Sequence, residues 1–169
     1  GVDCSDHEVN LKILLDAIVA DGDLTQKQRN ALLADMTEDV SALVLRDNYE
    51  QARAIYSSAA QAVSMAEVHE RYVRNLEQSG ILNRELESLP TTEELTERTS
   101  AGEALTTPEL AILLSYTKIS LAQELLASDL PEDPVFAAEL ERYFPDRLVE
   151  RFGEQLARHP LRREIIVTR

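Results

Sequence analysis

Apolar residues recur at intervals of three and four along most of this chain, which is the pattern of amphipathic helices. The first such segment covers residues 6–20, and its apolar stripe consists of Val9, Ile13, Leu14, Ala17 and Ile18. Gly22 is suited to end this helix, because glycine readily adopts the left-handed conformation of a C-cap. Thr25 and Gln28 have the spacing of a capping box and predict a second, short helix after the turn.

A longer helical pattern follows over residues 38–64. Asp47 and Asn48 interrupt its apolar stripe, and this interruption predicts a kink or a break in the helix. Ser64 is followed three residues later by a glutamate, so a capping box is predicted there. The helix that it opens should end at Gly80.

Residues 81–106 hold scattered leucines among many Glu and Thr residues and predict a connecting region. Thr107 and Pro108 then mark a helix start, since threonine caps helices and proline suits the first helical position. The helix predicted over residues 107–127 is apolar on nearly every side, so we expect it to be buried at the centre of the second half. Three shorter helices are predicted over residues 135–143, over 145–156 and from 160 onward.

These segments predict an all-α fold, a multi-helix bundle with two helical sub-bundles. Only residues 164–168 approach the period-two alternation of a strand. Four parts are expected along the chain. Residues 1–20 hold the end of an earlier domain and the first helix, and residues 21–80 form the first sub-bundle. Residues 81–106 connect it to the second sub-bundle, which covers residues 107–169.

Composition and charge narrow the classes of partner. The chain has 169 residues, of which 44% are hydrophobic and 28% charged, as in an ordinary globular protein. Its net charge of −14 argues against nucleic acid and anionic membrane surfaces as partners. Its apolar runs are also far shorter than the ~20 residues of a membrane span. Residues 142–169, with seven Arg against four acidic residues, are the one candidate surface for an anion.

Cysteine content and the chain ends give two further expectations. Cys4 is the single cysteine, so no disulfide can form within the chain, and no basic-then-apolar leader opens the sequence. Both features predict a cytoplasmic protein. Because the chain begins at Gly1 and stops within an apolar-periodic stretch, we interpret it as a piece of a longer protein.

Residues 3–8 gather a thiol, a hydroxyl, an imidazole and three carboxylates. Three interpretations are open: a zinc site, a nucleophile pair of Cys4 and His7, and a helix start capped by Ser5 or Asp6. The other two histidines stand alone, without neighbours at ligand spacing, which disfavours a metal. We predict no metal site and no catalytic residue in the chain.

The remaining candidates are weaker. Arg158, Arg162 and Arg163 flank His159 and could hold a phosphate or carboxylate, although an ion-pair cluster is favoured. His69 is interpreted as a packed or rim residue. The sequence contains no glycine-rich phosphate loop, no nucleophile elbow and no paired catalytic carboxylates. From its residues alone, the chain reads as an all-helical region without a complete active site.

Several strings along the chain are familiar in their order: GVDCSDHEVNLKIL at residues 1–14, NRELE at 83–87, LTTPELA at 105–111, YTKI at 116–119 and HPLRREII at 159–166. In this order they resemble the C-terminal helical region of the large bacterial NAD-dependent glutamate dehydrogenases. The resemblance implies a parent enzyme that oxidatively deaminates L-glutamate to 2-oxoglutarate and ammonia with NAD, and a homo-oligomer is expected. The family's catalytic lysine and aspartate and its dinucleotide-binding domain would precede Gly1, so the chain alone is expected to be inactive and to hold no cofactor-binding residue.

The resemblance also implies two substrate contacts. The small glutamate dehydrogenases have a related string, in which a Gly-Gly-Val is followed by a serine three residues after the valine and then by a glutamate. Val2, Ser5 and Glu8 keep that spacing. By resemblance, Val2 lines the pocket for the substrate side chain and Ser5 hydrogen-bonds the γ-carboxylate. A serine hydroxyl beside the free N–H groups of a helix N-terminus suits a carboxylate.

Two other functions stay open at this point. One is a helical interaction or scaffold domain without catalysis. The other is a small metal-dependent hydrolase that uses His7, His69 or His159.

Overall fold

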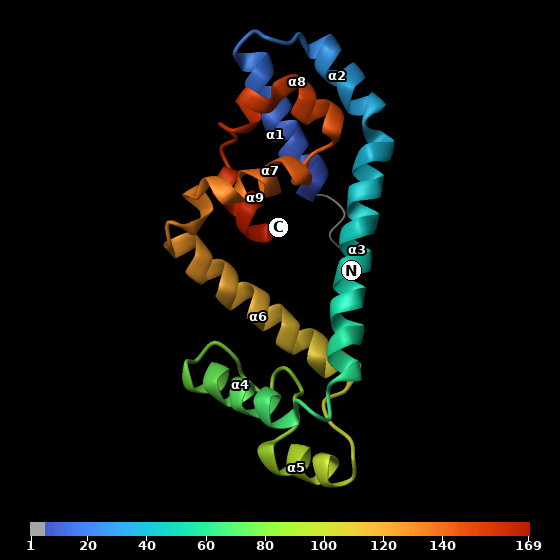
Figure 1. Cartoon of the computed structure of the whole chain (residues 1–169), viewed down its shortest axis with the longest axis vertical. Helices are drawn as coiled ribbons and strands as arrows, with labels where there is room; N and C mark the ends of the chain where they lie inside the picture. The colour runs from blue at the N-terminus through green and yellow to red at the C-terminus, as the bar shows by residue number, and fades with distance from the viewer. Residues whose placement is uncertain (1–5) are drawn as a thin grey trace. The chain divides into compact units, whose positions relative to one another are not determined.

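A computed structural model describes residues 6–169, which form helices joined by loops and contain no strand (Figure 1). The predicted all-α fold is confirmed. The α-helices are α1 Asp6–Ala20, α2 Gln26–Asp35, α3 Thr37–Ala60, α4 Ala66–Gln78, α5 Thr92–Ser100, α6 Thr107–Ala127, α7 Ala137–Tyr143, α8 Asp146–Leu156 and α9 Arg162–Thr168. Two short 3-10 helices, η1 Leu130–Glu132 and η2 Pro134–Phe136, lie between α6 and α7.

The chain divides into two compact units. The first combines the residues up to Glu50 with Ala122–Arg169, and the second is Gln51–Leu121. The first unit is therefore built from both ends of the sequence, and the boundaries fall inside α3 and α6. This division differs from the predicted boundaries after residues 20, 80 and 106, because a helical pattern shows where helices lie but not which distant helices share a core.

The core of the first unit is formed around α1. Its stripe of Leu11, Leu14, Leu15 and Ile18 is almost completely buried. The residues that cover this stripe come mostly from the last third of the chain: Leu24, Met36, Leu140, Tyr143, Phe144, Leu148, Phe152, Leu156, Ile165 and Ile166. Each fully buried aliphatic or aromatic side chain stabilises the fold by roughly 1.5–3 kcal/mol relative to exposure. The first helix and the last three helices therefore depend on one another.

The predicted stop of α1 and start of α2 are confirmed. Gly22 has a φ of +86°, and the N–H of Asp23 donates to the carbonyl of Ile18 at 3.2 Å, which closes the end of α1. Both bonds of the capping box between Thr25 and Gln28 are present at the start of α2.

The predicted kink in α3 is wrong, because the helix runs without a break through Asp47 and Asn48. The carboxylate of Asp47 instead accepts hydrogen bonds from His7 and Arg169. A polar residue within an apolar stripe here serves a contact with a distant part of the chain and does not bend its own helix.

Two predicted helix starts are also corrected. Ser64 does not cap α4, since its hydroxyl donates to the carbonyl of Gln61 and the helix begins at Ala66. Thr107 is already the first residue of α6, so Thr106 precedes the helix as its cap. The N–H and hydroxyl of Thr106 both donate to the Glu109 carboxylate, at 2.6 and 2.8 Å.

The second unit packs around leucines that include four from the predicted connecting region. Its buried residues are Ala62, Val73, Leu76, Leu82, Leu89, Leu95, Leu105, Leu110 and Leu113. Residues 81–106 thus form part of the packed unit, and a capping box of Thr91 and Glu94 starts α5 within them. Arg84 holds the preceding loop, because its guanidinium pairs with Glu77 at 2.8 Å and donates to the carbonyl of Pro90 at 2.7 Å.

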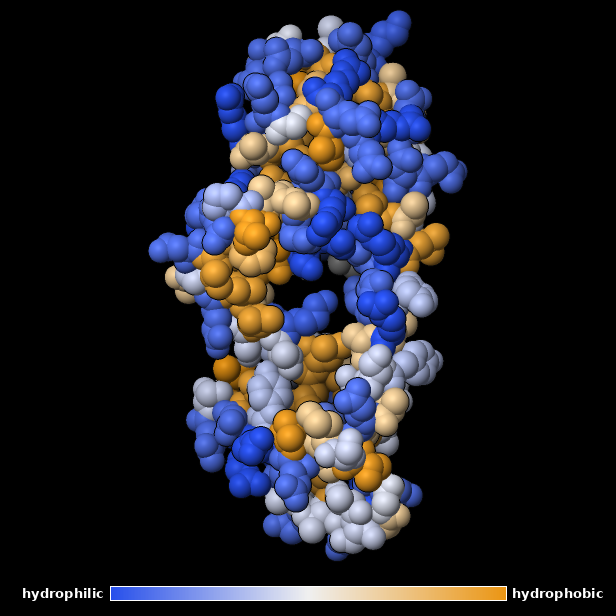
Figure 2. Space-filling model, viewed as in Figure 1, coloured by the Kyte–Doolittle hydropathy of each residue, from blue (hydrophilic) through white to orange (hydrophobic). Residues whose placement is uncertain are grey.

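The prediction that residues 107–127 form a fully buried central helix is wrong. In α6, only Glu109, Leu110 and Leu113 are buried, while Ile119 and Leu121 are each 51% exposed. Apolar side chains accordingly reach the molecular surface (Figure 2). Among the described helices, α6 alone is long and apolar enough to cross a membrane, judged by length and composition only, and core helices of soluble proteins pass the same test.

The packing of α1 makes a prediction about stability. Leu15 is fully buried, whereas Leu45 in α3 is 68% exposed. Leu15→Ala should lower the free energy of unfolding by about 2–5 kcal/mol, since it leaves a cavity in the core. The same change at Leu45 should cost less than about 0.5 kcal/mol. Urea denaturation followed by circular dichroism measures both, and equal effects would contradict this description of the core.

Candidate functional site

The candidate site lies at the start of α1. The predicted substrate residues Val2 and Ser5 fall outside the described residues, as does Cys4. The described structure begins directly after Ser5, with Asp6 as the first residue of α1. It therefore shows how the helix that follows the predicted substrate residues is held in place.

His7 anchors the first turn of α1. Its side chain is only 4% exposed, and both ring nitrogens face oxygen atoms. Nδ1 lies 2.9 Å from the carbonyl oxygen of Tyr143 in α7, and Nε2 lies 2.8 Å from Oδ2 of Asp47 in α3. Each ring nitrogen therefore has an oxygen within hydrogen-bond distance, one from the backbone of α7 and one from a side chain of α3. The ring also packs against the Tyr143 ring, with 4.2 Å between centroids.

Asp47 joins this anchor to the end of the chain. Its Oδ1 accepts a hydrogen bond from the Arg169 guanidinium at 3.1 Å, while Oδ2 faces His7. One carboxylate thus bridges two nitrogen groups from α1 and from the segment after α9. Loss of one partner from such a partly buried cluster leaves a charged or polar group uncompensated, which is far more costly than loss of a surface ion pair.

A second buried histidine contacts α1 one turn further on. Nε2 of His159 donates to the carbonyl of Asn10 at 3.0 Å, while Nδ1 accepts from the N–H of Leu161 at 3.0 Å. This pair of bonds fits the neutral imidazole with its proton on Nε2. Burial lowers the pKa of His159, and this effect outweighs the hydrogen bond to Asn10, which acts in the opposite direction. The Asn10 amide also donates to the Tyr143 hydroxyl at 2.8 Å.

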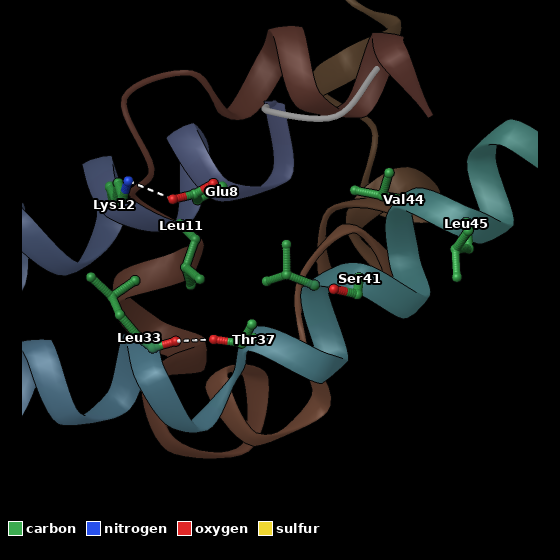
Figure 3. A pocket seen from close by; sticks show the side chains of 9 residues that line it. Glu8, Leu11, Lys12, Leu33, Thr37, Ser41, Val44 and Leu45 are labelled. Carbon is green, nitrogen blue, oxygen red and sulfur yellow. Dashed lines mark hydrogen bonds and ion pairs between the residues drawn. The ribbon is translucent and has the colours of Figure 1, made fainter. Parts of the chain in front are cut away.

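A groove runs along the other side of α1 (Figure 3). It has a volume of about 510 Å³ and is lined by residues of α1, α2 and α3: Glu8, Leu11, Lys12, Leu33, Thr37, Val40, Ser41, Val44 and Leu45. Lys12 and Glu8 pair with each other at 2.6 Å on its edge. The two charged side chains of the lining therefore compensate one another, and the groove presents mainly aliphatic surface.

The other candidates from the sequence take structural roles. Arg162 and Arg163 pair with the Glu132 carboxylate at 2.7 and 2.8 Å, so the predicted ion-pair cluster is confirmed for these two arginines. His69 lies in the second unit, apart from the unit that contains His7 and His159. Within residues 6–169, no group of three or more His, Cys, Asp or Glu side chains is placed to hold a metal ion.

The described residues do not fit a dinucleotide such as NAD. Dinucleotide folds hold the pyrophosphate at a glycine-rich turn between a strand and the start of a helix. Residues 6–169 include no strand. The glycines with positive φ, at Gly22, Gly80 and Gly102, all follow the ends of helices.

Comparison with known sequence families matches both ends of the chain. The family described as Bacterial NAD-glutamate dehydrogenase, catalytic domain, matches residues 1–58, and the family described as Glutamate dehydrogenase, C-terminal, matches residues 102–169. The chain belongs to the bacterial NAD-glutamate dehydrogenase family. The first match covers α1, α2 and most of α3, and the second covers α6 to α9, so each contributes helices to the first unit.

Individual glutamate dehydrogenases are similar in sequence to nearly the whole of this chain. The NAD-specific glutamate dehydrogenases of Halomonas elongata and Pseudomonas aeruginosa are each 50% identical to it, and that of Mycobacterium tuberculosis is 47% identical. Each comparison covers 99% of this chain and 10% of the relative. The chain thus spans about a tenth of the length of these curated relatives. The resemblance found in the sequence is confirmed.

Sequence reasoning found His7 but not its partners in this dehydrogenase region. Asp47 is 40 residues away and Tyr143 is 136 residues away along the chain. The available signal was a carboxylate inside the apolar stripe of α3. The Asp47 carboxylate indicates that a polar group faces this part of α3, but no pattern in a single sequence identifies which residue supplies that group.

The neutral state of His159 predicts a pH dependence of stability. Its pKa lies below the ordinary value of 6.5 in the folded chain, so the unfolded chain binds more protons as the pH falls below 6.5. The free energy of unfolding should therefore decrease between about pH 7 and pH 5. His159→Gln keeps one donor and one acceptor and should flatten that decrease. Urea denaturation across this range measures it, and identical slopes for both proteins would contradict the assignment.

Proposed function

We propose that this chain is the C-terminal helical region of a longer NAD-dependent glutamate dehydrogenase, which oxidatively deaminates L-glutamate to 2-oxoglutarate and ammonia. The observation that supports this most strongly is the identity of about 50% along 99% of the chain with NAD-specific glutamate dehydrogenases. Because the described residues do not fit NAD, the proposal assigns NAD binding to other parts of the enzyme, and the isolated chain is expected to be inactive.

In this proposal, the start of the chain forms one wall of the substrate site. Val2 lines the space for the glutamate side chain, and the Ser5 hydroxyl donates to the γ-carboxylate. Ser5 directly precedes α1, whose first N–H groups lack partners within the helix and carry partial positive charge. Glu8 in the first turn is paired with Lys12, which offsets its negative charge near this helix end.

The cellular location and assembly of the enzyme stay predictions. We propose a cytoplasmic enzyme that assembles as a homo-oligomer, with L-glutamate and NAD as its ligands and with neither nucleic acid nor membrane as a partner. The net charge of −14 supports the last part, since phosphate-rich surfaces repel an acidic chain.

An interaction or scaffold domain without catalysis is the second candidate. The exposed apolar residues in the later turns of α6, Ile119 and Leu121 among them, favour it. An assay of glutamate-dependent NAD reduction by the full-length protein separates the two functions. The scaffold role predicts no reduction, and the dehydrogenase role predicts turnover.

The proposed role of Ser5 makes a kinetic prediction. Removal of one hydrogen bond to a charged carboxylate costs ~1.5–3 kcal/mol. In the full-length enzyme, Ser5→Ala should therefore lower kcat/KM for glutamate by roughly 10- to 150-fold. The KM for NAD should hardly change, because the altered contact is with the other substrate. Steady-state kinetics with each substrate varied in turn measures both quantities.

The alternative for Ser5 is a helix cap alone. A lost cap costs about 1 kcal/mol of stability and leaves substrate recognition intact. Unchanged kinetic constants for glutamate, together with a lowered melting temperature, would remove Ser5 from the substrate site.

A further inference from the structure

The groove along α1 is an apolar surface that the described residues leave open (Figure 3). Its inner part is formed by Leu11, which is 1% exposed, and by Leu33 and Val40, which pack against the core of the first unit. Leu45 also lines it, with 68% of its surface exposed. The volume of about 510 Å³ lies within the ~300–1,000 Å³ range of sites that enclose small ligands, so several apolar side chains can enter.

The polar groups of the lining favour an apolar occupant. Lys12 and Glu8 neutralise each other at 2.6 Å, and the Thr37 hydroxyl donates to the carbonyl of Ala34 at 3.0 Å. A charged ligand would lose its water on entering the groove without gaining an ionic partner there. An apolar segment loses no such interaction, and its burial is favourable.

The groove belongs entirely to the part of the chain that matches a catalytic domain. All of its lining residues fall between residues 8 and 45, inside the catalytic-domain match at residues 1–58. The match to the C-terminal family, at residues 102–169, contributes none of them. Helices of that second match instead cover the buried stripe of α1. The helices α1 to α3 thus pack against the C-terminal family on one side and stay open along the groove.

A catalytic domain of this family needs more than α1 to α3. A dinucleotide fold holds its ligand at a turn between a strand and a helix, and residues 6–169 contain no strand. The relatives are about ten times as long as this chain, which covers 10% of each. The catalytic-domain match also precedes the C-terminal match along the sequence. Elements that share a domain bury their apolar surfaces against one another.

We propose that the groove is the docking surface for the rest of the catalytic domain. Its occupant is an amphipathic helix from the segment that precedes residue 1 in the same polypeptide, with its apolar face laid between α1 and α3. This inference rests on the proposed function, because it takes the chain as part of the longer dehydrogenase. In this arrangement α1 is held from two sides, and Leu45 loses its exposure to solvent.

Thiol reactivity in the full-length enzyme tests whether the groove is covered. Ser41 and Ser57 are both exposed on α3, but only Ser41 lines the groove. Ser41→Cys and Ser57→Cys are therefore matched and conservative changes. Alkylation by iodoacetamide, followed at each position by mass spectrometry, should be at least about tenfold slower for Ser41→Cys, since a covered thiol reacts only when its cover opens. The two rates should converge in urea, and equal rates in the folded enzyme would overturn the proposal.

Photo-crosslinking identifies the occupant. With p-benzoylphenylalanine in place of Leu45, irradiation of the full-length enzyme should link this position to a peptide that precedes residue 1, in a product with the mass of one subunit. The same probe in place of Val135, which is 71% exposed and outside the groove, should not reach that peptide. A product of twice the subunit mass, the same linked peptide from both positions, or no link from Leu45 would each overturn the proposal.

The wild-type enzyme offers the same test without a bulky substitution. Lys12 lies on the edge of the groove and is 45% exposed. If the probe at Leu45 prevents folding, an amine crosslinker should join Lys12 to a lysine that precedes residue 1 in the same subunit. Links from Lys12 to a second subunit alone, or to residues 6–169 alone, would overturn the proposal.

The proposed function fails by a different result, because none of these measurements depends on turnover. A protected Ser41→Cys thiol in an enzyme that does not reduce NAD with glutamate would refute the dehydrogenase function and leave the docking surface. Turnover in an enzyme whose Ser41→Cys and Ser57→Cys thiols react equally fast would refute the docking surface alone.

Discussion

The burial of the apolar stripe of α1 is the constraint on which the first unit depends. This stripe faces side chains from α7, α8 and α9, more than 120 residues later in the sequence. Neither part can bury its apolar surface alone, because each is too short to enclose a core. The region closest to the proposed substrate site is therefore stabilised by the last helices of the chain. In the proposed dehydrogenase, the last helices would thus support the start of α1.

Hydrogen bonds to two buried histidines add direction to this apolar packing. His7 lies in the first turn of α1, His159 contacts the Asn10 carbonyl of α1 about one turn later, and each has both ring nitrogens paired. The two differ in what they face. His7 faces two acceptors, whereas His159 faces one donor and one acceptor, which matches its lowered pKa. Apolar packing places α1 against its neighbours, and these bonds fix its position along and around its axis.

Local features of the fold were predictable from the sequence, and distant pairings were not. Gly22 and the Thr25 capping box were found because their chemistry acts within a few residues. The failures share the opposite property. Asp47 interrupts an apolar stripe and locally predicts a kink, but its partner His7 lies 40 residues away. The apolar composition of α6 predicts burial, but composition does not reveal what covers a helix. For the candidate site, Val2 and Ser5 are predicted by resemblance, while the contacts of His7 with α3 and α7 appear only in the structure.

Amide hydrogen exchange in the full-length enzyme tests most directly the claim that the start of α1 is a wall of the substrate site. Exchange is compared with and without L-glutamate and NAD, at concentrations where turnover shows that both bind. The account predicts slower exchange in the first turn of α1, around Asp6 and His7, and little change in α4 or α5. Protection elsewhere in the enzyme, with unchanged exchange at the start of α1, would contradict it.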